Sequence, residues 1–291
     1  PRSWSNYLGN TRYGAIVTNN AGGYSFFHSA VQGRFTRLWF NNVPLDQPGR
    51  YFYLRDQDSG DFWSGSWQPV GKPLERFQAR CRHGTGYTIL TARYGGIAAE
   101  STYFVPLDRD YEVWLLEVTN ESDRPRRLSV FPFVEFASEW APYHDQFNMQ
   151  YSQYIVHCEL VDGMIAQSIC HNLPEDPQNF QNRDQSRHAF FGVVGGEPSG
   201  FDTDRETFLG GPYRSYANPL VVERGACTGS LASGDDACGV FQVDVVLAPG
   251  ERRELLVLLG VGRAAVAGRA ARAEMSSPTA ARSALEAPRA H

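Results

Sequence analysis

Residues 87–120 read YTILTARYGGIAAESTYFVPLDRDYEVWLLEVTN, and this stretch decides the fold class. It contains two segments rich in β-branched and aromatic residues, 87–92 and 97–105, separated by Tyr94-Gly95-Gly96. Paired glycines supply the positive φ values of a tight turn, so the two segments are predicted to form a hairpin. A third segment of the same kind, 111–119, follows closely. Such runs at short spacing indicate antiparallel strands.

The same pattern extends in both directions from this stretch. Further strand-like segments occupy residues 13–18, 50–54, 126–136, 241–247 and 253–259. The segment 126–136 is expected to return beside 111–119, and the turn at Pro249-Gly250 predicts another hairpin between its two flanking segments. Helical periodicity is scarcely visible before residue 263. Many short strands with Gly and Pro turns predict an all-β protein, built as one large antiparallel β-sandwich.

The chain changes character after residue 262. Residues 263–291 are rich in Ala and Arg and contain no Phe, Trp or Tyr. Ser277 followed by Pro278 is typical of a helix cap and first helical residue. The predicted helix carries a single large apolar side chain, Leu285, so we expect it to be weakly anchored. The sequence therefore predicts a sandwich domain over residues 1–262, with the start of a helical linker over residues 263–291.

Composition excludes several classes of protein. Of the 291 residues, 42% are hydrophobic and 13% aromatic, which is unlike a disordered chain. The net charge of -5 offers no basic footprint for nucleic acid, and no apolar run reaches the length of about 18 residues that a membrane helix needs. We therefore expect neither a nucleic acid nor a membrane as a partner.

The cysteines indicate a reducing compartment. Their number is odd, and they lack the spacing of a metal site: Cys81, Cys158, Cys170, Cys227 and Cys238. In a chain too large to need disulfides, this favours reduced thiols and a cytoplasmic protein without a bound metal. Only Cys227 and Cys238 are near each other in the sequence; two ordinary thiols are favoured over a pair.

No complete catalytic motif is visible. The glycine turn at residues 20–25 lacks a phosphate-binding frame, and a close-packed turn is the favoured interpretation. Glu135, Glu139 and Asp145 fall within one segment, and general acid–base chemistry on a glycoside would need two carboxyl groups about 5 to 9.5 Å apart. A solvated rim beside an aromatic strand is the favoured interpretation of these three acids.

Aromatic and polar side chains alternate between Trp140 and Tyr151. Sugars present apolar C–H faces and hydroxyl groups, so sites for them combine flat rings with amides and carboxylates. Carbohydrate binding and core packing are equally compatible with this cluster. For the second aromatic cluster, around Trp63 and Trp67, packing in the core is favoured.

Several motifs, in order along residues 2 to about 286, resemble glycoside hydrolase family 94, which contains the cellobiose, cellodextrin and chitobiose phosphorylases. They are Trp4-Ser5-Asn6-Tyr7-Leu8-Gly9, Asn20-Ala21-Gly22-Gly23-Tyr24-Ser25-Phe26, Arg34-Phe35-Thr36-Arg37, Ser66-Trp67-Gln68-Pro69-Val70, Cys81-Arg82-His83-Gly84, Phe104-Val105-Pro106-Leu107, Phe133-Val134-Glu135-Phe136 and Gly200-Phe201-Asp202-Thr203-Asp204-Arg205. The resemblance implies a galactose-mutarotase-like supersandwich, then a helical linker and an (α/α)6 catalytic barrel.

The resemblance also implies a reaction. Family members split a β-linked disaccharide or short oligosaccharide with inorganic phosphate, inverting the anomeric carbon, and need no cofactor beyond that co-substrate. The catalytic acid belongs to the barrel, so this chain is expected to contain no catalytic residue and to be inactive as a fragment of a cytoplasmic homodimeric enzyme.

Substrate contacts are the expected contribution of this chain. In the family, a loop after the Phe-Val-Glu-Phe strand reaches the acceptor subsite of the partner subunit, and the matching positions are Asn148, Met149, Gln150 and Tyr151. Gln150 matches the family's glutamine. Tyr151 stands where cellobiose phosphorylases carry arginine, and residues 54–61 resemble the chitobiose phosphorylase hairpin. Both details argue against a cellobiose phosphorylase. The alternatives are a non-catalytic carbohydrate-binding sandwich, a purely structural one and, more remotely, a cyclic β-glucan synthase module.

Overall fold

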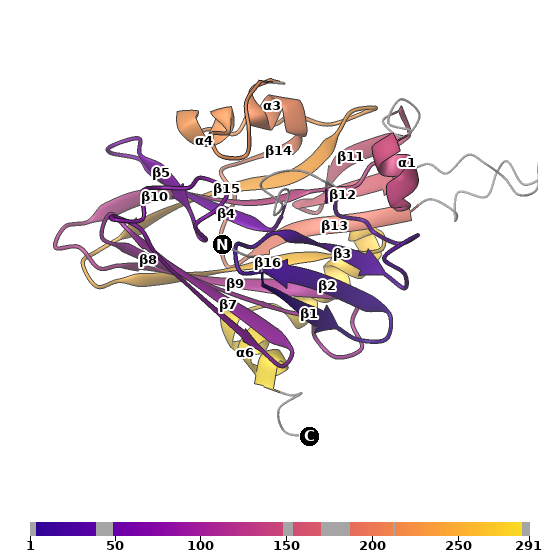
Figure 1. The fold of residues 1–291 in the computed structure, drawn as a ribbon, viewed down its shortest axis with the longest axis horizontal. Coiled ribbons are helices and arrows are strands. Elements are labelled where there is room, and N and C mark those ends of the chain that lie inside the picture. The colour runs from indigo at the N-terminus through magenta and orange to yellow at the C-terminus, as the bar shows by residue number, and fades with distance from the viewer. Residues whose placement is uncertain (1–3, 39–48, 148–153, 170–186, 212, 287–291) are drawn as a thin grey trace, which may run out of the picture.

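The computed structural model describes residues 4–38, 49–147, 154–169, 187–211 and 213–286. In these residues, antiparallel strands form a three-stranded, a five-stranded and an eight-stranded sheet. The larger two sheets face each other across one core (Figure 1). The predicted all-β antiparallel sandwich is therefore confirmed.

The strands of the two larger sheets come from distant parts of the chain, whereas those of the smallest sheet are consecutive. The three-stranded sheet contains β1 (Ser5–Gly9), β2 (Tyr13–Thr18) and β3 (Gly23–Phe27). The five-stranded sheet contains, in spatial order, β14 (Gly200–Asp204), β15 (Ala237–Leu247), β10 (Arg126–Glu135), β4 (Tyr51–Asp56) and β5 (Phe62–Ser64). The eight-stranded sheet contains β11 (Val156–Val161), β12 (Met164–Ile169), β13 (Arg187–Val194), β16 (Arg252–Val261), β9 (Tyr111–Asn120), β8 (Ile97–Phe104), β7 (Tyr87–Tyr94) and β6 (Gln78–Gly84).

Short helices join or cover these sheets. They are α1 (Pro142–Phe147), α3 (Arg205–Leu209), α4 (Leu220–Arg224), the π-helix η2 (Ala264–Gly268), α5 (Arg269–Glu274) and α6 (Pro278–Glu286). Helices α3 and α4 lie over the outer face of the five-stranded sheet, where Phe208 of α3 stacks on Phe133 of β10 at a centroid distance of 4.9 Å.

The hairpin predicted at Gly95-Gly96 is confirmed. Tyr94 of β7 pairs with Ile97 of β8, and both glycines have positive φ, 58° and 80°. Strand β9 then pairs antiparallel with β8, so the stretch 87–120 supplies three adjacent strands of the eight-stranded sheet.

Two other predicted hairpins are wrong, although their strands are present. Strands β9 and β16 belong to the eight-stranded sheet, whereas β10 and β15 belong to the five-stranded sheet. The turns at residues 121–125 and 248–251 therefore carry the chain from one layer to the other. A tight turn between two strand-like segments fixes only that the chain reverses, and the partner of each strand is decided by packing across the core.

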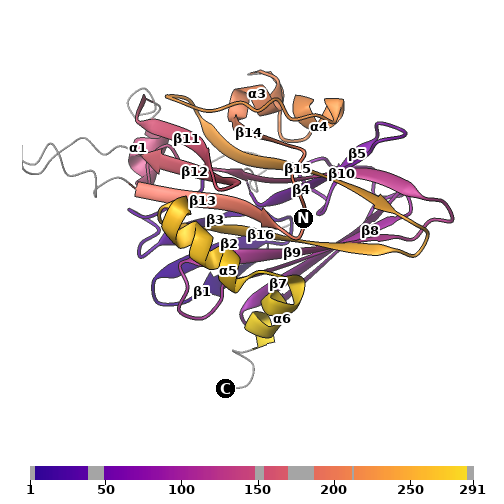
Figure 2. The same ribbon diagram turned by 180° about the vertical axis from the view of Figure 1, so that it is seen from behind.

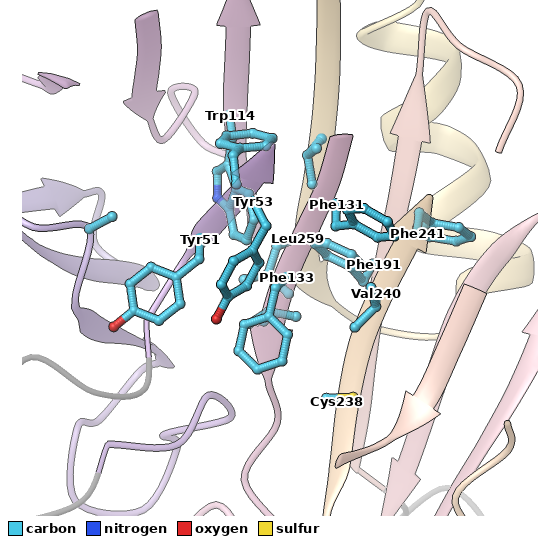
Figure 3. Packing of buried hydrophobic residues seen from close by; sticks show 14 of the residues in the cluster. Tyr51, Tyr53, Trp114, Phe131, Phe133, Phe191, Cys238, Val240, Phe241 and Leu259 are labelled. Atoms are coloured by element: carbon cyan, nitrogen blue, oxygen red, sulfur yellow. The ribbon is translucent and has the colours of Figure 1, made fainter. Parts of the chain in front are cut away.

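Aromatic side chains pack on both faces of the five-stranded sheet, and Trp114, Phe191 and Phe241 lie between the two large sheets (Figure 3). Trp114 of β9 meets Phe52 of β4 edge to face at 5.8 Å, and Phe191 of β13 stacks on Phe241 of β15 at 5.9 Å. Each of these contacts joins one sheet to the other. Trp63 is also buried, as predicted for a core tryptophan.

The C-terminal helices lie on the outer face of the eight-stranded sheet (Figure 2). Helix α6 has the predicted start, because Ser277 Oγ accepts a hydrogen bond from the Ala280 N–H at 3.2 Å. Helix α6 lies against the sheet: Ala281 is buried in a second apolar cluster, Leu285 packs partly buried against that cluster, and Arg282 pairs with Glu254 of β16. Its weak anchoring stays a prediction. The domain boundary at residue 262 stays a prediction.

We expect Phe191→Ala to lower the free energy of unfolding by about 3 to 5 kcal/mol, because it leaves a cavity between Trp114 and Phe241. Urea denaturation of the 291-residue chain measures this change. Val246→Ala, at a side chain that is 62% exposed, is the control and should change the free energy by less than about 0.5 kcal/mol. A Phe191→Ala loss below about 1 kcal/mol would show that the sheets do not depend on this contact.

Candidate functional site

The predicted substrate-binding residues Asn148, Gln150 and Tyr151 lie outside the residues that the structure describes. The structure does describe what holds the chain on either side of them. Strand β10 ends at Glu135, and helix α1 follows after a turn and ends at Phe147. We call residues 135–147, together with the side chains that hold them, the candidate site. It lies where the ends of the sheets meet α1 (Figure 1).

Arg37 is the centre of this region, and its side chain has no exposed surface. Its Nε and Nη2 donate to the two carboxylate oxygens of Asp145, at 3.0 and 2.8 Å. Its Nη1 donates to Glu135 at 3.1 Å and to Asp236 at 2.7 Å, while Nη2 also donates to Ser138 Oγ at 2.7 Å. The planar guanidinium thus holds three acids from separate parts of the chain in one fixed arrangement, which we call the Arg37 cluster.

A second arginine completes the Arg37 cluster. Arg205, at the start of α3, lies 2.5 Å from Asp236 and 3.7 Å from Glu135. The Tyr216 hydroxyl donates to the other oxygen of Glu135. The acids of the cluster therefore face guanidinium groups and hydroxyl donors in place of water.

The pKa directions follow from burial and from these partners. Burial opposes the charge on Arg37, but attraction to Asp145, Glu135 and Asp236 raises its pKa well above the usual value. Burial also opposes the charge of Asp236, yet Arg37 and Arg205 together lower the pKa of this carboxyl. For Glu135, burial is the strongest influence and raises its pKa despite both arginines.

The interpretation of Glu135, Glu139 and Asp145 as a solvated rim is wrong, because each is at most 3% exposed. Nor does the arrangement suit general acid–base catalysis, since each carboxylate is bound to an arginine: Glu135 and Asp145 to Arg37, and Glu139 to Arg187. A catalytic acid or base needs access to the substrate's proton. These acids have a structural function.

The Arg37 cluster fixes the turn that leads into α1. Asp145 Oδ1 accepts the backbone N–H groups of Ser138 at 2.7 Å and of Glu139 at 3.3 Å. Glu139 in turn accepts the backbone N–H of Trp140 at 2.7 Å. From the eight-stranded sheet, Gln167 Nε2 donates to the Ala137 carbonyl at 2.8 Å. Residues 137–145 are therefore held from several sides.

The aromatic residues predicted as a cluster from Trp140 onward include both core and surface side chains. Trp140 is only 5% exposed and packs on Phe35 at a centroid distance of 5.7 Å, so it belongs to the core. Tyr143 is 70% exposed and His144 is exposed beside it. Tyr154, the first described residue after position 153, is 81% exposed. Exposed aromatic side chains thus flank positions 148–153 on both sides.

Other features have ordinary structural roles. Residues 20–25 include the turn between β2 and β3, where a Cβ on Gly23 would lie 2.0 Å from the Ile16 carbonyl oxygen, so the close-packed turn is confirmed. Cys227 and Cys238 are free thiols, as favoured. Among the described residues, no group of three or more His, Cys, Asp and Glu could hold a metal, and no helix has the length and hydrophobicity to cross a membrane.

Comparison with solved structures supports the fold. A bacterial glucoamylase complexed with acarbose has a TM-score of 0.53 at 7% identity, covering 98% of this chain and 38% of its own. A putative kojibiose phosphorylase from the human microbiome has a TM-score of 0.51 at 8% identity, covering 96% and 34%. Both are proteins that contain a β-sandwich of this kind as one part of a longer chain.

The family itself is shown by sequence. The supersandwich domain model of glycosyl hydrolase 94 matches residues 1–278, and the chain therefore belongs to this family, as the motifs predicted. It is 38% identical over 263 residues to N,N'-diacetylchitobiose phosphorylase of Vibrio furnissii, covering 90% of this chain and 31% of that protein. It is 34% identical over 253 residues to solabiose phosphorylase of Paenibacillus borealis, covering 86% and 31%. The chain thus spans about a third of the length of these relatives.

Sequence reasoning missed the residues that build the site. Arg37, Arg205 and Asp236 lie far from Glu135 in the sequence, and nothing in their local context separates a buried charge from a solvated one. The one available signal is that Arg37 and Arg205 each end a motif shared with the family: Arg34-Phe35-Thr36-Arg37 and Gly200-Phe201-Asp202-Thr203-Asp204-Arg205.

The lowered pKa of Asp236 makes a prediction about acid stability. A carboxyl whose pKa is lower in the folded state stabilises the fold at pH values above its unfolded pKa, about 3.9, and loses that contribution as the pH falls through the folded value. We expect Asp236→Asn to be less stable than the wild type at pH 7, by about 3 to 5 kcal/mol, because it removes a buried carboxylate that pairs with both Arg37 and Arg205.

The difference between Asp236→Asn and the wild type should shrink below about pH 4. Urea denaturation at pH 7 and pH 3 measures it. Asp235→Asn, at the neighbouring exposed position, is the matched control and should follow the wild type at both pH values. If the two proteins differ in free energy of unfolding by the same amount at pH 7 and pH 3, the lowered pKa of Asp236 is contradicted.

Proposed function

We propose that this chain is the N-terminal sandwich of an inverting disaccharide phosphorylase. The observation that carries this proposal is the family match over residues 1–278, together with relatives named as disaccharide phosphorylases that align along 86 to 90% of the chain. In the proposed reaction, a phosphate oxygen bonds to the anomeric carbon of a β-linked disaccharide. The glycosidic C–O bond breaks, and an acid outside this chain protonates the leaving oxygen.

The chain would act in this enzyme as a scaffold with no catalytic residue. The best candidates for acid–base chemistry, Glu135, Glu139 and Asp145, are each occupied by an arginine. Phosphate is itself the nucleophile, so the reaction needs no second carboxylate as a base, unlike inverting hydrolysis. This matches a site in which Glu135, Glu139 and Asp145 are used for structure.

The proposed contribution to the substrate site is the segment that contains Asn148, Gln150 and Tyr151, which would complete the acceptor subsite of the partner subunit in a homodimer. Two features support it. The Arg37 cluster holds the preceding helix α1 rigidly, and Tyr143 and Tyr154 are exposed on either side of the segment. Exposed aromatic rings are typical of surfaces that meet another molecule.

The first substrate to test is N,N'-diacetylchitobiose. It is the substrate in the name of the Vibrio furnissii relative, which is 38% identical to this chain. Tyr151 in place of the arginine of cellobiose phosphorylases points in the same direction, since a planar ring can stack on a sugar face. Cellobiose is the comparison substrate.

The test begins by sequencing the coding DNA around these 291 codons, so that the complete protein can be produced and assayed. The complete protein is expected to convert the disaccharide and inorganic phosphate into a free sugar and an α-sugar 1-phosphate, because inversion of a β bond gives the α product. The 291-residue chain alone should be inactive. If the complete protein shows no phosphorolysis, the proposed activity is wrong; if the chain alone binds oligosaccharide, a carbohydrate-binding function is favoured instead.

Within the complete enzyme, Gln150→Ala should raise the KM for the acceptor sugar about 5- to 10-fold by removing a hydrogen bond, and leave the KM for the sugar 1-phosphate unchanged. Tyr151→Ala should act in the same direction. Initial rates of the synthetic reaction measure both constants. Gln32→Ala, at an exposed position, is the control. An unchanged acceptor KM in both variants would leave the sandwich with a structural role alone.

A further inference from the structure

We propose that a groove on the outer face of the eight-stranded sheet is the docking site for the part of the complete enzyme that follows this chain. The occupant is a segment that carries carboxylates opposite Arg80 and Arg82 of β6 and an apolar side chain over Ile89 of β7. This inference rests on the proposed function, in which the catalytic part of the enzyme lies outside these 291 residues. It identifies the surface of the sandwich on which that part is seated.

The groove begins at the end of helix α6. A cavity of about 450 Å³ lies between the helix, where Leu285 and Glu286 line it, and the sheet, where Thr102 of β8 and Leu115 of β9 line it. A second cavity of about 290 Å³ continues over β7 and β6. Glu100 of β8 lines both cavities, so the two form one groove. Helix α6, whose last residue is Glu286, therefore ends in this groove.

The described helices cover only one part of this face. The C-terminal helices pack over β12, β13 and β16, where Phe190, Leu256 and Leu258 are buried beneath them (Figure 2). Strand β6 lies at the other edge of the sheet, and among the sixteen described strands it alone has no buried residue. A strand is stabilised chiefly by side-chain packing on its faces, so an entirely uncovered strand indicates a missing partner.

The charges at the β6 end of the groove indicate the chemistry of the occupant. Arg80 and Arg82 pair in register with Thr91 and Ile89 of β7, and all four residues line the second cavity. Both arginines are exposed, and neither forms an ion pair with a described residue. Two neighbouring positive charges repel each other, and carboxylates on an occupant would offset that repulsion. The partly exposed Ile89 between the strands offers an apolar contact.

The amount of protein outside this chain favours the same occupant. The chain covers 31% of the Vibrio furnissii relative, so about two thirds of a protein of that length lies beyond the described residues. A second copy fits less well, because two identical grooves in twofold contact would place their arginines opposite each other. Arginine on an edge strand can also prevent edge-to-edge pairing, but that would not account for the groove beside β6.

The experiment uses the complete enzyme and measures how fast each arginine reacts with phenylglyoxal, by mass spectrometry of its peptides. Arg80 and Arg82 should react at least about 5-fold more slowly than they do in the urea-denatured enzyme, because an occupied groove excludes the reagent. Arg124, which is exposed in the turn between β9 and β10, is the matched control and should react at close to its denatured rate.

A variant tests the charge of the occupant. Arg80→Ala combined with Arg82→Ala should lower the melting temperature of the complete enzyme by about 2 to 4 °C at low salt, and by less at high salt, because screening weakens the pairs that are lost. Without an acidic occupant, the same change would remove only mutual repulsion and would leave the melting temperature unchanged or higher. Arg124→Ala is the control and should leave it unchanged.

The possible results separate this inference from the proposed function. If the complete enzyme catalyses phosphorolysis while Arg80 and Arg82 react as fast as Arg124, the docking site is wrong and the proposed function stands. If the two arginines are protected but no phosphorolysis occurs, the docking site stands and the proposed activity is wrong. Protection that disappears when the enzyme is diluted to monomers would assign the groove to a second copy and overturn the inference. A complete protein that ends with this chain would overturn both.

Discussion

Arg37 carries its charge where water is excluded, and the three acids that surround it are buried with it. Taking such charges out of water costs free energy that their mutual attraction only partly returns, so a buried ion cluster is a poor way to gain stability. It is an effective way to define geometry, because the guanidinium binds its partners in only one arrangement. The turn after β10, the start of α3 and the helix α1 all take their positions from this cluster.

A second buried cluster has the same character at the other junction of the fold. Arg50, just before β4, pairs with Glu112 of β9 at 2.5 Å, and the Glu112 carboxylate also accepts the hydroxyl of Tyr13 from β2 at 3.2 Å. Ser25 of β3 donates to the same carboxylate at 2.7 Å. One acid thus joins the three-stranded sheet to both large sheets. The aromatic core holds the layers together, and the two clusters decide how they are placed.

The use of buried acids for geometry agrees with the scaffold role proposed for this chain. The acids of the candidate site are used to fix the backbone, and the exposed groups nearby include the aromatic side chains of Tyr143, His144 and Tyr154. The C-terminal helices add to the same rigidity, since Glu274 of α5 binds both Arg109 and the hydroxyl of Tyr111 on the outer face of the sheet. The sandwich, the turn before α1 and the C-terminal helices thus form one continuous framework.

The sequence by itself determined the all-β class, eight of the sixteen described strands, the family and the start of helix α6. The alternation of aromatic and β-branched residues, the turn at Gly95-Gly96 and the cap at Ser277 are local signals, and local backbone chemistry acts on them directly. Only the tertiary structure decided that β9 and β10 lie in different sheets, that Glu135 is buried beside Arg37, and that helix α6 lies on the outer face of the eight-stranded sheet. Each of these depends on residues distant in the chain, because burial and charge pairing are properties of the packed layers and not of any one segment.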